Sequence, residues 1–121
     1  MRAIVCRELS GVGGLELAEI PTPEPGPGEV RLRVRACGLN FADTLMIKGQ
    51  YQDKPALPFV PGMEVAGRID ACGPDVAGFV PGERVMAALG HGGFAEMAIC
   101  PAEAIVRLPE SIDDIAAAGF A

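Results

Sequence analysis

Residues 28–51 read GEVRLRVRACGLNFADTLMIKGQY, and within this stretch a strand pattern passes directly into a helix pattern. Apolar residues alternate with arginines over 29–36, which is typical of a strand that buries one face. The apolar face comprises Val30, Leu32, Val34 and Ala36, and the basic face comprises Arg31, Arg33 and Arg35. We interpret the basic row as a solvated face rather than a nucleic-acid surface, because the chain has a net charge of −6.

A short helix is predicted over 41–48, FADTLMIK, immediately after the strand. Asn40 is a suitable N-cap because its side chain can accept a hydrogen bond from the first turn. Asp43 lies in that turn, where the helix dipole favours a carboxylate. Gly49 is expected to end the helix. The peptide ACGLNFAD around Asn40 therefore joins a strand to a helix and gathers a thiol, an amide and a carboxylate.

Short strand patterns extend outward from this stretch in both directions, separated by turns rich in glycine and proline. The predicted strands cover 2–7, 14–20 (with Leu15 and Leu17 on one face), 64–73, 81–87 (a turn and then a strand), 92–102 and 104–109. Segments 21–29 and 50–62 contain several prolines and are predicted to be connectors. The sequence therefore predicts a mainly β fold, a partly open barrel with short helices.

Two segments near the ends of the chain carry local motifs: a glycine-rich loop at 10–14 and a helix start near Ser111. SGVGG at 10–14 resembles a dinucleotide loop, but Glu16 stands where G-x-G-x-x-G requires its last glycine and a strand follows. We interpret it as a hairpin turn. A second helix is predicted near the C-terminus, with Ser111 as N-cap and Asp114 three residues later. Because this apolar helix opens close to Ala121, we expect the chain to be a fragment.

Composition limits the function classes. A chain of 121 residues that is 50% hydrophobic suffices for one domain. The acidic balance argues against nucleic acid and anionic membranes as partners. No apolar run approaches ~18 residues and the N-terminus has no signal core, so we expect a soluble cytoplasmic protein. The four cysteines form no C-x-x-C pair and are predicted to be buried thiols, and the single histidine, His91, is predicted to be exposed in a loop.

The order of motifs resembles the N-terminal catalytic domain of the medium-chain dehydrogenase/reductase superfamily. These motifs are the opening stretch at 28–51, then LPFVPGMEVAGRIDACG (57–73), PGERVMA (81–87) and GGFAEMAICPA (92–102). The resemblance implies a GroES-like β-barrel over 1–121 that lacks the Rossmann domain normally following it. GLNFADT and the sequence Gly49-Gln50-Tyr51 resemble the zinc-independent branch of quinone oxidoreductases, related enoyl reductases and zeta-crystallins.

Departures from the zinc-dependent relatives of this superfamily imply a site without zinc. Asn40 stands at the position of a ligating cysteine, and Met63 stands at the position of a ligating histidine. The segment ALGHGGF replaces the cysteine-rich lobe that holds a structural zinc. An amide and a thioether are poor substitutes for imidazole and thiolate as zinc ligands. The resemblance then leaves Cys37 a structural role.

The resemblance also implies a set of site residues. Asn40, Phe41, Asp43 and Thr44 match a segment that lines the cleft for the nicotinamide and its ribose. Asn40 could hydrogen-bond the cofactor or the substrate without a change of charge. Tyr51 matches a tyrosine placed to donate a proton or to bind a substrate carbonyl in related enoyl reductases. Leu45 occupies a position where some quinone oxidoreductases have a second tyrosine, which leaves the substrate open.

The expected activity is hydride transfer from NADPH or NADH to a quinone or to an activated C=C, an NAD(P)H:quinone oxidoreductase-like reaction without zinc. The small-molecule substrate would be a quinone or an enone, and the resemblance implies a homodimer for the full-length protein. We expect the 121-residue chain alone to be inactive and to bind NADPH weakly. Two alternatives stay open: an enoyl-thioester reductase domain, and a non-catalytic, free-standing GroES-like module.

Overall fold

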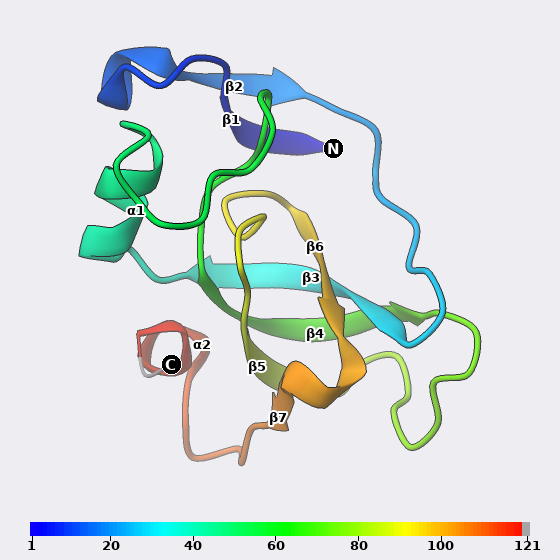
Figure 1. Ribbon diagram of the computed structural model, residues 1–121. Coiled ribbons are helices and arrows are strands. Elements are labelled where there is room, and N and C mark those ends of the chain that lie inside the picture. The colour runs from blue at the N-terminus through cyan, green and yellow to red at the C-terminus, as the bar shows by residue number, and fades with distance from the viewer. Residues whose placement is uncertain (120–121) are drawn as a thin grey trace.

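The computed structural model describes residues 1–119, which form two antiparallel sheets and two short α-helices. Strand β1 (Arg2–Cys6) pairs with β2 (Leu15–Glu19) in a two-stranded sheet. The second sheet has the strand order β6-β3-β4-β5-β7. Its strands are β3 (Glu29–Cys37), β4 (Glu64–Cys72), β5 (Arg84–Ala88), β6 (Met97–Pro101) and β7 (Ile105–Arg107). Both sheets are visible in Figure 1, where the two-stranded sheet lies above the five-stranded one.

Isolated bridges connect β1 to the segments that precede β4 and β6, and the two sheets are not closed into one continuous barrel. Ala3 bridges to Ala95, and Cys6 bridges to Phe59. The predicted fold class, a mainly β and partly open GroES-like barrel with short helices, is therefore confirmed. Helix α1 (Phe41–Met46) follows β3, and helix α2 (Asp114–Ala118) ends the described chain (Figure 1). No helix within residues 1–119 is long and apolar enough to cross a membrane.

The main core is aliphatic and is built by the alternating strands, as the pattern of β3 predicts. Val30 and Leu32 are fully buried, and β3 pairs with β4 on one side and β6 on the other. The alternation is interrupted by register shifts near Arg31 and Val34. The buried members of this core are Val30, Leu32, Val65, Ile69, Val85, Ala87 and Cys100. The C-terminal end of β3 pairs with β4, which fixes the position at which α1 begins.

A second apolar cluster holds α1 against the two-stranded sheet. Its buried members are Cys6, Met46, Ile47 and Phe59, with Leu15, Tyr51 and Met63 packed around them. Leu17 does not join Leu15 in this cluster and is 63% exposed, although the register of β2 places both side chains on the same face. The segment 11–14 forms a 3₁₀ helix between β1 and β2, in place of a tight turn. The hairpin connection predicted for SGVGG is nevertheless confirmed.

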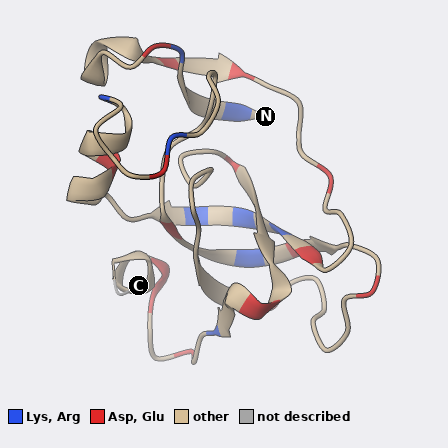
Figure 2. Cartoon of the chain, viewed as in Figure 1, with Lys and Arg blue, Asp and Glu red and all other residues tan. Residues whose placement is uncertain are grey.

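The arginine row of β3 is only partly solvated. Arg31 binds Asp70 at 2.8 Å and its side chain is mostly buried, whereas Arg33 and Arg35 are largely exposed. Figure 2 places basic residues on β3 and β4 and acidic residues across many other segments. Arg33 also pairs with Asp70, at 3.5 Å, and Arg35 approaches Asp114 at 4.0 Å. The row therefore makes ion pairs with acidic neighbours, which is consistent with the prediction that it is not a nucleic-acid surface.

Two predicted elements differ in the structure. The strand predicted over 92–102 is confined to β6, and residues 94–96 instead bond to β1: Ile4 N donates to Phe94 O at 2.8 Å and Glu96 N donates to Arg2 O at 3.1 Å. The N-cap of α2 is Asp113, whose Oδ1 accepts a hydrogen bond from Ala116 N at 2.7 Å. The prediction of Ser111 as N-cap is wrong. Asp114, expected to close a capping box, instead forms an ion pair with Arg84 of β5 at 3.2 Å.

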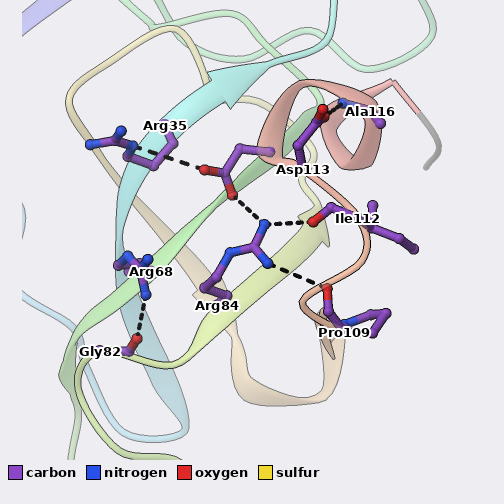
Figure 3. Close-up of polar contacts among 9 residues, drawn as sticks. Arg35, Arg68, Gly82, Arg84, Pro109, Ile112, Asp113 and Ala116 are labelled. Atoms are coloured by element: carbon purple, nitrogen blue, oxygen red, sulfur yellow. Dashed lines mark hydrogen bonds and ion pairs between the residues drawn. The ribbon is translucent and has the colours of Figure 1, made fainter.

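Arg84 explains why α2 begins later than its sequence suggests (Figure 3). Its guanidinium donates to Pro109 O at 3.3 Å and to Ile112 O at 2.6 Å. It also donates to Asp114 Oδ1 at 3.2 Å. These contacts hold the segment before the helix against β5. Helix α2 then packs Ala117 and Ala118 against Ala66 of the sheet.

We expect Arg84→Met to loosen the segment before α2. The substitution removes a guanidinium that is only 20% exposed and leaves two carbonyls and a carboxylate without their donor. The cost should be about 1–3 kcal/mol of unfolding free energy. Arg68→Met is the matched control, because Arg68 is exposed and donates to a single carbonyl, Gly82 O (Figure 3). Denaturant unfolding checks both; equal losses would contradict the role given to Arg84.

Candidate functional site

The candidate site lies at the junction between β3 and α1. Asn40 is the N-cap of α1, with extended backbone angles (φ −119°, ψ 155°), as predicted. Its backbone N–H donates to Asp43 Oδ2 at 2.9 Å. Asp43 lies in the first turn, also as predicted, and this bond is the carboxylate half of a capping box. The capping contact between Asn40 and Asp43 therefore fixes the backbone of Asn40 at the end of β3.

A buried carboxylate from β4 holds the Asn40 side chain. Asn40 Nδ2 donates to Glu64 Oε1 at 3.1 Å, and Glu64 is only 6% exposed. Glu64 is the first residue of β4, and its carbonyl accepts from Gly38 N at 2.9 Å. Sequence reasoning assigned no role to Glu64 and therefore missed this contact. The available signal was a carboxylate at the start of an otherwise apolar strand, EVAG, where a charge needs a partner.

Gly38 makes the close approach of these groups possible. A Cβ atom at this position would lie 2.6 Å from Glu64 Cγ and 2.5 Å from Ala118 O, and closer still to Glu64 Oε1. Any side chain here would therefore displace either the Glu64 carboxylate or the last turn of α2. The strand end, the buried carboxylate and α2 meet at this glycine.

Both carboxylate oxygens of Asp43 accept hydrogen bonds from backbone N–H groups. Asp43 is 3% exposed, and its two carboxylate oxygens accept from Asn40 N at 2.9 Å and Gly62 N at 3.2 Å. Asp43 thereby ties the start of α1 to the loop that precedes β4. This loop also carries Met63, at the second position where zinc-dependent relatives have a ligand. The contact of Asp43 with a cofactor stays a prediction, and the contacts present in the structure give it a positioning role.

Phe41 and Thr44 complete the exposed side of the junction. The Phe41 side chain is 77% exposed, and its neighbour Leu39 is 78% exposed. Thr44 Oγ1 donates to Phe41 O at 2.6 Å, within the first turn of α1. An aromatic face and an amide therefore lie next to each other along the chain, with the ring largely open to solvent. Both types of group suit a flat, polar heterocycle.

Tyr51 is partly buried and packs against the second cluster, which also contains Met46 and Met63. The structure brings Asn40 into direct contact with both Asp43 and Glu64. The proton-donor role of Tyr51 stays a prediction.

Cys37 is partly buried and packs against glycines near the site. Cβ atoms built on Gly62 and Gly93 would lie 3.0 Å and 2.8 Å from its sulfur. Burial, and then the charge of Asp43, raise the pKa of the Cys37 thiol to about 12. A thiol with this pKa is protonated at neutral pH and is a poor nucleophile or ligand. The packing is consistent with the structural role that the sequence implied for Cys37.

Among residues 1–119, no group of three or more His, Cys, Asp or Glu side chains is placed to hold a metal ion. The expectation of a zinc-free site stays a prediction.

His91 is exposed, as predicted, and its ring meets Phe59 edge-on with centroids 5.9 Å apart. A surface hollow of about 360 Å³ lies between β7 and α2, and its lining includes none of the predicted site residues.

The two sheets define the class, a GroES-like and partly open barrel, and Asn40 and the buried Glu64 form a polar junction at the end of β3. Residues 26–110 match the family model described as the alcohol dehydrogenase GroES-like domain. The chain belongs to this family. Several proteins named quinone oxidoreductase are similar to it over most of its length, in agreement with the branch that the sequence motifs indicated.

Three similar proteins illustrate the relationship. The synaptic vesicle membrane protein VAT-1 homolog-like of Mus musculus is 38% identical over 99% of this chain and 29% of its own length. The quinone oxidoreductase-like protein 2 of Rattus norvegicus is 42% identical over 92% of this chain and 31% of its own. The quinone oxidoreductase of Thermus thermophilus, also solved with NADPH, matches with a TM-score of 0.79 and 42% identity. The match covers 94% of this chain and 34% of the Thermus thermophilus chain. The chain spans about 30% of the length of the curated relatives it matches.

Proposed function

We propose that this chain is part of an NAD(P)H-dependent, zinc-independent oxidoreductase that transfers hydride to a quinone or to an activated C=C. The observation that carries the proposal is Asn40: an amide held by the buried Glu64 occupies the position of a zinc-ligating cysteine. The surrounding framework is that of the alcohol dehydrogenase GroES-like family. The change therefore removes metal chemistry from a retained scaffold and leaves hydrogen bonding in its place.

The residues at the junction fit a nicotinamide cofactor in part. Asn40 offers an amide and Phe41 offers an exposed ring, and Thr44 has a hydroxyl in the same turn. We propose these three as cofactor contacts, with Asp43 acting through the backbone of Asn40. When bound, NAD(P)H would supply the hydride. The chain's own residues would orient the ring, and we retain Tyr51 as the proposed proton donor or carbonyl ligand.

The remaining properties of the full-length protein are proposals of the same kind. We propose that residues 1–121 form the N-terminal catalytic domain and that a following Rossmann domain binds most of the dinucleotide. The chain alone would then be inactive and would bind NADPH weakly. A homodimer, a cytoplasmic location and a small-molecule quinone or enone substrate remain predictions. Support comes from relatives about three times as long, several of them named quinone oxidoreductases.

The test is turnover by the full-length protein in the presence of a chelator. We expect NADPH oxidation with a quinone or an enone that persists after chelation, and we expect Asn40→Ala to reduce it by tenfold or more. Turnover only with a crotonyl thioester would favour the enoyl-thioester reductase. Activity that disappears with the chelator and returns with zinc would overturn the zinc-free proposal.

A second candidate, a non-catalytic module, is favoured by one observation. Two of the similar proteins are named synaptic vesicle membrane protein VAT-1 homolog-like, a name that states no reaction. NADPH binding by the full-length protein without turnover on quinones, enones or enoyl thioesters would support this candidate.

A further inference from the structure

The Asn40 amide can adopt two orientations, related by a flip, unless a neighbouring group favours one of them. An amide carries two N–H donors on one end and a carbonyl acceptor on the other, and rotation by half a turn exchanges them. A ligand that meets Asn40 therefore encounters either a donor or an acceptor. The junction can recognise a particular ligand group only if one of these orientations is fixed.

Glu64 supplies the group that can fix it. An ionised carboxylate only accepts hydrogen bonds, so the Asn40 atom that lies 3.1 Å from Glu64 Oε1 must be Nδ2. The reverse orientation would place a carbonyl oxygen against a carboxylate oxygen. Because Glu64 is only 6% exposed, this repulsion would be weakly screened.

The carboxylate is itself held in place. Glu64 begins β4, pairs with Ala88 of β5 and accepts from Gly38 N through its carbonyl. Its side chain lies so close to Gly38 that no Cβ fits between them, and Ala118 O closes the other side. Glu64 therefore has a rigid backbone and little room to change rotamer.

We propose that Glu64 is the positioning residue of the candidate site: its buried carboxylate fixes the direction in which the Asn40 amide faces. A ligand at the junction then always meets the Asn40 amide in the same orientation. Glu64 acts on the ligand only through Asn40. This inference rests on the proposed function for its kinetic consequences. The orientation of the amide itself can be tested without any activity.

The first experiment is NMR on the full-length protein labelled with ¹⁵N in asparagine. Asn40 is the only asparagine among these 121 residues, and the side-chain signal lost in Asn40→Ala identifies it. In Glu64→Gln the new side chain can either donate or accept, so we expect the Asn40 NH₂ signals to shift and to broaden or double. Glu103→Gln, at an exposed carboxylate, is the charge-matched control and should leave them unchanged. Unshifted Asn40 signals in Glu64→Gln would overturn the proposal, whether or not the protein is an enzyme.

The second experiment exchanges the two groups. Asn40→Asp alone places two carboxylates in contact, whereas Asn40→Asp with Glu64→Gln restores one amide and one carboxylate across the same distance. We expect Glu64→Gln to raise the KM for NADPH by about tenfold with a smaller change in kcat, and the double variant to exceed Asn40→Asp by about fivefold or more in kcat/KM. Purely additive losses would mean that Glu64 only supports folding. An inactive wild type would reject the proposed function, and the NMR result would still decide the role of Glu64.

Discussion

Replacing Asp43 by alanine is expected to cost about 2–5 kcal/mol of unfolding free energy, a large share of the roughly 5–15 kcal/mol typical of a domain. Asp43 is 3% exposed and accepts hydrogen bonds from Asn40 N and Gly62 N. Alanine would leave both backbone donors without a partner in a place that water reaches poorly. The start of α1 and the loop before β4 would separate, and the candidate site would lose its shape together with its stability.

Two variants separate this effect from the general loss of a helix cap. Asp113→Ala removes an exposed N-cap with a single bond to Ala116 N and should cost only about 1 kcal/mol. Asp43→Asn keeps the size of the side chain but has one accepting oxygen, so it should fall between wild type and Asp43→Ala. Denaturant unfolding of the three variants gives the ranking. If Asp43→Ala and Asp113→Ala lose the same amount, Asp43 is an ordinary cap.

Local patterns in the sequence were sufficient for the junction itself. The alternation over 29–36 predicted β3, and the order Asn40, then Asp43, predicted the start of α1. Both rest on interactions between residues a few positions apart. Such interactions are fixed by side-chain period and capping chemistry, which depend little on the remainder of the fold.

Contacts between distant segments were not predictable in the same way. Glu64 is 24 residues from Asn40, and nothing in either segment alone indicates that they meet. Likewise Ser111 satisfies the local rules for an N-cap, but Arg84 of β5 binds the segment around Ile112 and moves the helix start to Asp113. Leu17 follows the same strand period as Leu15, yet the second apolar cluster does not extend to it and it is 63% exposed. In each case tertiary packing decides among locally permitted states.

The family resemblance identifies the position of Asn40 but not the contacts that hold its side chain. Sequence comparison with zinc-dependent relatives identifies which ligand positions have changed, here Asn40 and Met63. It does not show that the amide is held by a buried carboxylate or that Gly38 provides the space. That support is visible only in three dimensions, and it turns a substituted ligand position into a candidate binding group with a fixed orientation.

Gly38→Ala is expected to damage both stability and the candidate site. The added methyl group would lie 2.6 Å from Glu64 Cγ and 2.5 Å from Ala118 O, so the carboxylate or α2 must move. Overpacking of this kind typically costs about 1–3 kcal/mol. Because Glu64 holds Asn40, we also expect the Asn40 side-chain NMR signals to shift and NADPH binding by the full-length protein to weaken by about tenfold.

Gly90→Ala is the matched control, because a Cβ there meets no atom within 4 Å and the backbone has no positive φ. It should leave unfolding, the Asn40 signals and NADPH binding unchanged. A second variant, Gly38→Ala with Glu64→Ala, removes the side chain that clashes while leaving the clash with Ala118 O. If the double variant recovers stability but not NADPH binding, the site depends on Glu64 itself and not merely on the space beside it. If Gly38→Ala behaves like Gly90→Ala, the close contact among β3, β4 and α2 does not control the junction.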